Sequence, residues 1–276
     1  MTELSPSTIA FIGGGNMASA LIGGLVRAGR APASILAIDP GDAARARLQA
    51  DFGVRTQPAA DAALAGAGLV VWAVKPQLFG EAAAPCAAHL AGALHLSVMA
   101  GIRSDAIARA MGLALDAARI VRSMPNTPAL IGRGIAGLFA TPAVSAAERA
   151  QVEGVLAPTG QTLWVDREAD LDAVTALSGS GPAYVFYLIE QLTLAAKHQG
   201  FNEADAALLV NETFLGAAEL LVASGKSPEA LRKQVTSPNG TTERAIARMG
   251  QTDLEAMFNE ATDAALARAR ELAAGN

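Results

Sequence analysis

The residues with the clearest chemical potential lie in a glycine-rich segment near the N-terminus. An apolar run over 9–12 is followed by Gly-Gly-Gly-Asn-Met-Ala at 13–18 and then by an Ala- and Leu-rich stretch. In such a sequence Gly13 permits a tight turn, Gly15 lets the backbone approach a pyrophosphate, and the small Ala18 lets a helix pack on the strand. The N–H groups that open the helix would face the phosphates. The segment predicts dinucleotide binding, and the alternative is an ordinary strand-to-helix turn.

A carboxylate occupies the place where such proteins recognise the adenosine ribose. Asp39 follows a second apolar run, 35–38, about 20 residues beyond the glycine loop. A carboxylate there hydrogen-bonds the ribose 2′-hydroxyl and disfavours a 2′-phosphate. Arg45 and Arg47 follow and could pair with a phosphate, unless they belong to a solvated helix face. The sequence therefore leaves both NAD(H) and NADP(H) open as the cofactor.

A second pattern that can hold an anion lies late in the chain. Residues 237–242 read Ser-Pro-Asn-Gly-Thr-Thr and precede a stretch with helical spacing. If Gly240, Thr241 and Thr242 begin a helix, their backbone N–H groups and the positive end of the helix dipole can bind a carboxylate. The other interpretation is that Ser237 or Thr241 only caps the helix.

Alternating strands and helices must position the glycine loop and Asp39. Over the first 165 residues, short apolar runs alternate with Ala- and Leu-rich stretches of helical spacing. This alternation predicts a mostly parallel sheet wrapped by helices. The expected strands are 8–12, 35–38, 69–74, 94–98, 120–124, 135–139 and 162–165, and the expected helices are 17–28, 43–51, 104–111 and 145–156.

From Asp166 onward the pattern is helical throughout. Residues 178–181, Ser-Gly-Ser-Gly, precede Pro182, which suits the first turn of a new helix. We therefore expect two domains, a dinucleotide-binding domain over 1–165 and an all-helical domain over 166–276. The expected helices of the second domain are 171–177, 182–198, 203–223, 228–235, 241–249 and 253–273.

Composition excludes several classes of protein. Hydrophobic residues make up 51% of the chain and charged residues 17%, which is not a disordered composition. The net charge of −5 argues against a nucleic-acid partner. The N-terminus lacks a basic segment followed by an apolar one, and apolar runs such as 69–74 are too short to span a bilayer, so we expect no secretory signal and no membrane partner.

The metal-ligating residue types are few and scattered. Cys86 is the one cysteine, so no intrachain disulfide can form, which suits a cytoplasmic location. His89, His95 and His198 show no metal-ligand spacing, and we expect them at the surface or at helix ends. We therefore expect no metal site.

Four further segments complete a pattern that spans nearly the whole chain. They are Val-Lys-Pro-Gln at 74–77, Arg-Ser-Met-Pro-Asn-Thr-Pro-Ala at 122–129, Leu-Ser-Gly-Ser-Gly-Pro-Ala-Tyr-Val-Phe at 177–186, and Val-Thr-Ser-Pro-Asn-Gly-Thr-Thr at 235–242. With the glycine loop, and in this order, they resemble the pyrroline-5-carboxylate reductase family. The resemblance implies a Rossmann domain followed by an all-α dimerisation domain. It implies a homo-oligomer, either a dimer or a decamer built from dimers.

The resemblance also implies a reaction and a set of site residues. Hydride would pass from NAD(P)H to the C=N bond of 1-pyrroline-5-carboxylate, giving L-proline in the last step of proline biosynthesis. The Thr242 hydroxyl would bond the ring nitrogen, directly or through water, as the catalytic group. The substrate-binding residues would be Glu168, Ser180, Gly181, Ser237, Gly240, Thr241 and Thr242. The cofactor-binding residues would be Gly13, Gly14, Gly15, Asn16, Met17, Asp39, Ala73, Val74, Lys75, Pro76, Met99, Ala100 and Asn126.

Some of these residues have a plainer interpretation. Lys75 and Glu168 could be solvated surface charges, and Asn126 could serve only its turn between two prolines. The sequence also departs from the family pattern twice. Asn239 stands where the family has glycine, and Ala59–Ala60 stand where many members carry an asparagine near the ribose. Asn tolerates a left-handed backbone better than other non-glycine residues, so we expect the loop shape to persist.

Two other functions fit parts of the pattern. A β-hydroxyacid dehydrogenase-like oxidoreductase would share the architecture, but it carries a catalytic lysine soon after the second glycine-rich segment. Here no lysine follows Gly181 until Lys197. A non-catalytic nucleotide sensor would keep the glycine loop without needing Thr242 or the segment 177–186. Both features are present, which favours an active reductase.

Overall fold

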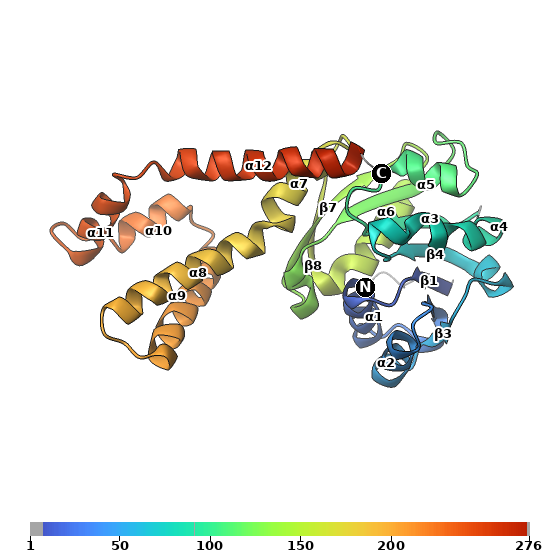
Figure 1. The fold of residues 1–276 in the computed structure, drawn as a ribbon, viewed down its shortest axis with the longest axis horizontal. Coiled ribbons are helices and arrows are strands. Elements are labelled where there is room, and N and C mark those ends of the chain that lie inside the picture. Colours follow the sequence, from blue (N-terminus) through green and yellow to red (C-terminus); the bar gives the residue numbers. More distant parts are fainter. Residues whose placement is uncertain (1–7, 91, 275–276) are drawn as a thin grey trace. The chain divides into compact units, whose positions relative to one another are not determined.

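The computed structural model describes residues 8–90 and 92–274, and these form two compact units (Figure 1). The chain up to Ser180 forms the first unit together with the residues from Ala265 onward, and Gly181–Ala264 form the second. Residues 166–180, which were expected in the second domain, thus belong to the first compact unit. The expected end of the dinucleotide-binding domain at residue 165 stays a prediction.

One eight-stranded sheet organises the first unit, in the order β3-β2-β1-β4-β5-β6-β7-β8. Every described pair of neighbours is parallel except β6 and β7, which run antiparallel. This confirms the predicted mostly parallel sheet. The strands are β1 (Thr8–Ile12), β2 (Ile35–Ile38), β3 (Arg55–Gln57), β4 (Ala67–Trp72), β5 (Leu94–Ser97), β6 (Ile120–Met124), β7 (Gly134–Ala140) and β8 (Gly160–Trp164).

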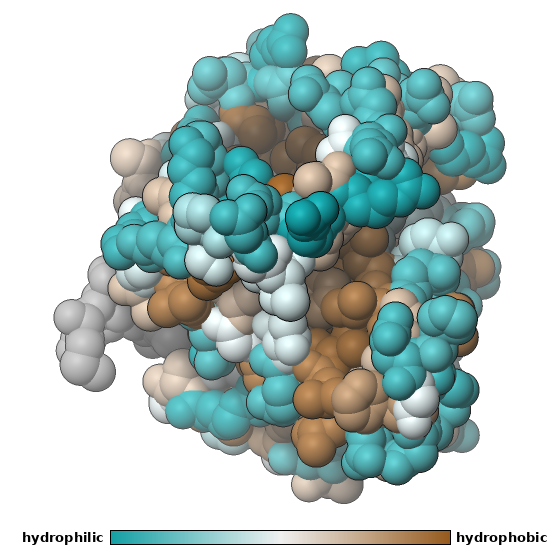
Figure 2. Space-filling model, turned by 90° about the vertical axis from the view of Figure 1, so that its left-hand side faces the viewer, coloured by the Kyte–Doolittle hydropathy of each residue, from teal (hydrophilic) through white to brown (hydrophobic). Residues whose placement is uncertain are grey.

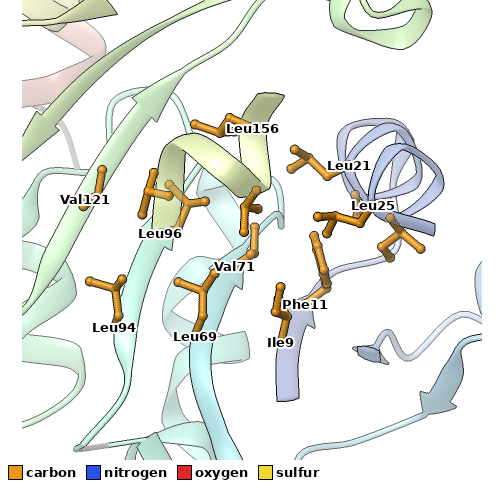
Figure 3. Close-up of a cluster of buried hydrophobic side chains, with 14 of the residues drawn as sticks. Ile9, Phe11, Leu21, Leu25, Leu69, Val71, Leu94, Leu96, Val121 and Leu156 are labelled. Atoms are coloured by element: carbon orange, nitrogen blue, oxygen red, sulfur yellow. The ribbon is translucent and has the colours of Figure 1, made fainter. Parts of the chain in front are cut away.

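Helices bury both faces of this sheet. On one face, α1 (Asn16–Arg27), α2 (Asp42–Phe52) and α6 (Ala146–Leu156) contribute to a cluster that includes Ile9 and Phe11 of β1 (Figure 3). The next residues along β1, Ala10 and Ile12, belong to the cluster on the other face. There α3 (Phe79–Ala83), α4 (Ala87–Leu90) and α5 (Ser104–Ala110) cover the sheet. Burial on both faces explains why the central strands read as continuous apolar runs.

Several elements differ from the sequence-based expectations. Strand β3 was not expected, because Arg-Thr-Gln lacks an apolar pattern, and the short helices α3 and α4 were not expected either. The strand expected over 69–74 ends at Trp72, so Ala73 and Val74 lie beyond the strand. These two residues are free to line a site at the end of the sheet.

The expectation for His95 is wrong. Its side chain is fully buried in β5, where Nδ1 accepts a hydrogen bond from Trp72 Nε1 at 3.1 Å. The bond assigns the proton of the neutral ring to Nε2. Burial, and then the positive charge of Arg119, lowers the pKa of His95 to about 4.

The segment expected to start a new helix at Pro182 is instead part of a nearly continuous helical run. Helix α7 (Asp170–Val174) passes into one turn of π-helix at Thr175–Gly179, and α8 begins at Gly181. The Ser180 N–H donates to the Thr175 carbonyl at 2.9 Å, the i to i+5 pattern of a π turn. Pro182 cannot donate to the preceding turn, and a π turn is one way a helix accommodates such a break. Single π turns occur often at functional sites.

The second unit is helical, as predicted. It contains α8 (Gly181–His198), α9 (Glu203–Ser224), α10 (Pro228–Gln234), α11 (Thr241–Met249) and the first half of α12 (Leu254–Ala274). Helices α8 and α9 pack side by side as a hairpin (Figure 1). The Asn202 side chain caps α9, and Gly225 ends this helix with φ 62°.

The helices of the second unit expose many apolar side chains. Phe186, Leu208 and Leu220 are all exposed, and Val222 is 82% exposed. Apolar residues also reach the surface on the face shown in Figure 2. Among the described helices, α9 is long and apolar enough to cross a membrane, which is weak evidence by itself. The sequence interpretation considered only shorter apolar runs.

Candidate active site

A cavity of about 530 Å³ opens at the carboxyl ends of β1, β2 and β4. In a doubly wound sheet this edge, where the strand order reverses between β1 and β4, is the usual ligand site. Six of the residues expected to bind the cofactor line it: Gly13, Gly15, Asp39, Ala73, Val74 and Lys75. Its other walls are mainly apolar and include Pro58, Ala59, Ala60, Leu78, Ala82, Pro85 and Cys86.

The glycine loop has the shape that its sequence predicts. Gly13 has φ +101°, and a Cβ there would lie 2.6 Å from the Ala73 carbonyl oxygen. At Gly15 a Cβ would meet no described atom within 4 Å. Gly15 is also the N-cap of α1, and no side chain among the described residues caps that helix. The loop therefore leaves an open cradle beside unpaired N–H groups, which fits a pyrophosphate.

Asp39 holds this loop as well as lining the cavity. Its carboxylate accepts hydrogen bonds from the backbone N–H of Gly14 at 2.7 Å and of Gly41 at 2.8 Å. Each carboxylate oxygen keeps a further lone pair, so the group can also accept from a ribose hydroxyl. The tie to Gly14 was not expected, since the residues lie far apart in sequence.

The two arginines after Asp39 are not simply solvated. Arg45 Nη1 donates to the Asp39 carbonyl at 2.7 Å, and its other nitrogen pairs with Asp42. Arg47 Nη2 donates to the Gly14 carbonyl at 3.0 Å. Arg45 therefore holds the backbone of Asp39, and Arg47 contacts the glycine loop while its side chain stays exposed.

The remaining cofactor residues expected from the sequence lie outside this cavity. Gly14 is buried within the loop, Asn16 is exposed in the first turn of α1, Met17 is half-buried and Pro76 begins a 3₁₀ turn. Met99 is 3% exposed and belongs to the core, whereas Ala100 beside it is exposed. Asn126 accepts a hydrogen bond from the Ile135 N–H at 3.0 Å, so it ties the turn after β6 to the start of β7.

Glu168 is not a solvated surface charge. Its Oε1 accepts from Arg122 Nη1 at 3.0 Å and from the Ser104 N–H at 2.7 Å. Burial lowers the pKa of Arg122, and the Glu168 carboxylate opposes that shift. The sequence offered no signal for this pair, because it joins β6 to a loop that follows β8.

The turn 237–242 lies in the second unit and leads directly into α11. Asn239 has φ 59°, which confirms that Asn adopts the left-handed conformation here. Gly240 is the N-cap of α11, and a Cβ there would lie 2.6 Å from Ser237 Oγ. Among the described residues no side chain caps α11, so neither Ser237 nor Thr241 is the cap. Thr241 is exposed and Thr242 is half-buried in the first turn of the helix.

The residues expected around the second glycine-rich segment lie where the two units meet in the chain. Ser180 ends the first unit and Gly181 begins the second, and both are half-buried. Within the described part of the chain no group of three or more His, Cys, Asp or Glu side chains could hold a metal ion.

The chain matches two family models and is similar to pyrroline-5-carboxylate reductases of several bacteria. A family model described as pyrroline-5-carboxylate reductase dimerisation matches residues 168–272. A second model, described as NADP oxidoreductase coenzyme F420-dependent, matches residues 8–101. The pyrroline-5-carboxylate reductase of Pseudomonas aeruginosa is 43% identical over 275 residues, 98% of each chain. That of Vibrio alginolyticus is 37% identical over 96% of this chain and 97% of its own.

Solved structures agree in fold. A pyrroline-5-carboxylate reductase from Coxiella burnetii has a TM-score of 0.92 at 36% identity, over 97% of this chain and 99% of its own. The pyrroline carboxylate reductase of Plasmodium falciparum, solved with NADP bound, has a TM-score of 0.82 at 24% identity, over 97% of this chain and 98% of its own. At that identity it shows the shared fold.

The Rossmann sheet, its cavity and the helical second unit define a nicotinamide-dependent oxidoreductase. The chain belongs to the pyrroline-5-carboxylate reductase family. It uses NAD(P)H to reduce 1-pyrroline-5-carboxylate to L-proline, which confirms the reaction implied by the resemblance and favours it over a β-hydroxyacid dehydrogenase. Residues 168–272 make up its dimerisation domain.

Proposed function

We propose that the cavity at the ends of β1, β2 and β4 holds the adenosine and pyrophosphate parts of NAD(P)H. The open cradle at Gly15 is the observation that carries this assignment, because a Cβ there would fill space that no described atom uses. The N–H groups of the first turn of α1 bind the pyrophosphate, and the Asp39 carboxylate accepts from the ribose. The apolar walls around Ala59 and Ala82 suit the adenine ring.

We propose that the turn 237–242 binds the substrate. The uncapped N–H groups at the start of α11 hold the carboxylate, and the Thr242 hydroxyl hydrogen-bonds the imine nitrogen. When bound, the reduced nicotinamide supplies a hydride to the C=N carbon. The role of the chain is then to fix the imine at hydride-transfer distance and to supply a proton path to nitrogen through Thr242 or a water. We expect the backbone of Ser180 and Gly181 to approach the nicotinamide or the substrate, and we expect Asn126, in the turn after β6, to lie next to the nicotinamide.

The first assay follows oxidation of NADH and NADPH by 1-pyrroline-5-carboxylate, as the loss of absorbance at 340 nm. The second assay tests the rival function by following reduction of NAD⁺ and NADP⁺ with a β-hydroxyacid. Reduction of the imine alone is expected. Folded, dimeric protein that oxidises neither cofactor with the imine would overturn the assignment. Turnover of the hydroxyacid would favour the rival dehydrogenase.

We also propose that the exposed apolar faces of α8 and α9 are buried against a second copy of the chain. The match to a dimerisation model and the exposure of Phe186 and Val222 support this. A dimer, alone or assembled into a decamer, is expected in sedimentation at micromolar concentration, and a monomer would contradict it. We expect a cytoplasmic enzyme without nucleic-acid or membrane partners, in keeping with its net charge of −5.

A further inference from the structure

Four charged side chains join three elements of the first unit. Arg122 of β6 donates from Nη1 to Glu168 Oε1 at 3.0 Å, and the same oxygen accepts from the Ser104 N–H, which opens α5, at 2.7 Å. Arg103 pairs with Asp172 of α7 across 3.4 Å. Arg122 and Asp172 are each 5% exposed. We call Arg103, Arg122, Glu168 and Asp172 the charge cluster.

The charge cluster is a costly way to stabilise a fold. Burying charges sacrifices their hydration, and apolar residues of similar volume often give equal or greater stability. One polar atom, Arg122 Nε, has no hydrogen-bond partner among the described residues. What these pairs add is a fixed placement of the elements that they join, because separating a buried pair leaves a charge without its partner. The cluster fixes the position of α7, and of the loop before it, relative to β6 and α5.

Two close packing contacts also hold α7 and the π turn against the sheet. At Gly137 of β7, a Cβ would lie 2.7 Å from Val174 Cγ1, so the last residue of α7 packs directly on the strand. At Gly179, the last residue of the π turn, a Cβ would lie 2.7 Å from Met124 Cε. Met124 ends β6, two residues beyond Arg122. The π turn is therefore held at the carboxyl end of β6, the strand that contributes Arg122 to the charge cluster.

We propose that Glu168 and Arg122 are positioning residues for hydride transfer, which hold α7 so that the π turn presents Ser178, Ser180 and Gly181 at a fixed place. This rests on the proposed function, in which that segment meets the substrate and the nicotinamide. Glu168 thus acts through Arg122, in place of the direct substrate contact expected from the sequence. Both of the contacts that its Oε1 makes are already internal ones.

The first test is Glu168→Gln, which keeps an oxygen for Ser104 and removes the charge that holds Arg122. We expect kcat for imine reduction to fall about 10- to 100-fold, since small misplacements of reacting groups have effects of that size. KM for NADPH should change less than about 2-fold, because the cavity is untouched. The matched control is Asp105→Asn, which breaks an exposed pair with Arg109 on the same α5 and should leave kcat unchanged.

The second test displaces α7 without altering any charge. Gly137→Ala places a methyl group against Val174, and we expect kcat to fall while KM for NADPH holds. Adding Val174→Ala removes the clashing methyl groups and should restore most of kcat. Melting temperatures of all variants show that each is folded at the assay temperature.

The outcomes separate three possibilities. A rise in KM for pyrroline-5-carboxylate with unchanged kcat in Glu168→Gln would mean direct substrate binding and would overturn the positioning role. Wild-type kinetics in Glu168→Gln, or a loss that merely follows the unfolded fraction, would also overturn it, as would failure of Val174→Ala to rescue Gly137→Ala. Inactivity of the wild-type protein would instead reject the proposed function.

Discussion

The Asp39 carboxylate accepts a hydrogen bond from the Gly14 N–H at 2.7 Å, so the residue that we propose to bind the ribose also holds the glycine loop. In the proposed function the two residues contact different parts of one dinucleotide, and this hydrogen bond joins them, since Asp39 follows β2 and Gly14 follows β1. A change at Asp39 must therefore act on every dinucleotide through the loop and on the ribose through its own oxygens.

Asp39→Ala is expected to weaken both cofactors but NADH more. The loop loses acceptors for the Gly14 and Gly41 N–H groups, which weakens both, and NADH also loses the ribose contact, at about 1–3 kcal/mol. NADPH recovers part of its loss because a repelling carboxylate is gone. Steady-state kinetics with both cofactors measure the ratio of kcat/KM. If that ratio stays constant, Asp39 holds only the loop.

Gly15→Ala is expected to impair nucleotide binding without destabilising the protein. The new methyl group enters the open cradle, where no described atom lies within 4 Å. NADPH affinity, followed by fluorescence titration, should fall about 10-fold or more, equivalent to about 1.4 kcal/mol. The melting temperature should match that of Gly66→Ala, a glycine whose added Cβ would also meet no described atom within 4 Å. Unchanged affinity would place the pyrophosphate elsewhere.

Thr242→Ala is expected to damage catalysis more than folding. The backbone N–H groups of α11 remain, so the carboxylate is still held, while the imine nitrogen loses its hydroxyl. We expect kcat/KM to fall about 10- to 100-fold, or roughly 1.4–2.7 kcal/mol. Thr242→Ser should recover most of the activity. Kinetics are compared with thermal melts of both variants, and a rate loss that tracks unfolding would reduce Thr242 to a structural role.

Protonation of His95 is expected to destabilise the protein in mild acid. The pKa of His95 is about 4 in the folded protein and about 6.5 in an unfolded chain. Between these values the unfolded state binds more protons, so stability is fully present above about pH 6.5 and falls toward pH 4. Urea unfolding from pH 4.5 to 7.5 should show a shallower pH slope for His95→Gln than for wild type. The exposed His198→Gln is the control, and equal slopes in all three would contradict the assignment.

The sequence predicted the local features of the fold and site well. The run Thr8–Ile12 and the glycines after it form a strand and a loop because each step is governed by neighbouring residues. The left-handed Asn239 was predictable for the same reason. The burial of His95 could also have been predicted from the sequence, because this residue lies between two leucines in an apolar run.

The missed features depend on contacts between distant residues. Strand β3 lies at the edge of the sheet, so its sequence has no apolar pattern. It forms because its backbone pairs with β2. The π turn arises from a shift of one hydrogen bond in a segment whose composition suits a helix start. The pairing of Glu168 with Arg122 joins residues 46 apart in sequence, so spacing alone gives no signal for it.

The cavity wall carries the one cysteine of the chain, and this has a practical consequence for labelling. Cys86 is buried, its Sγ–H donates to the Ala82 carbonyl, and burial raises its pKa to about 11. Maleimides and other thiol reagents attack the thiolate, so the folded enzyme presents almost no reactive sulfur at neutral pH. A cysteine introduced on the surface can therefore carry a fluorophore at one defined site with Cys86 left in place.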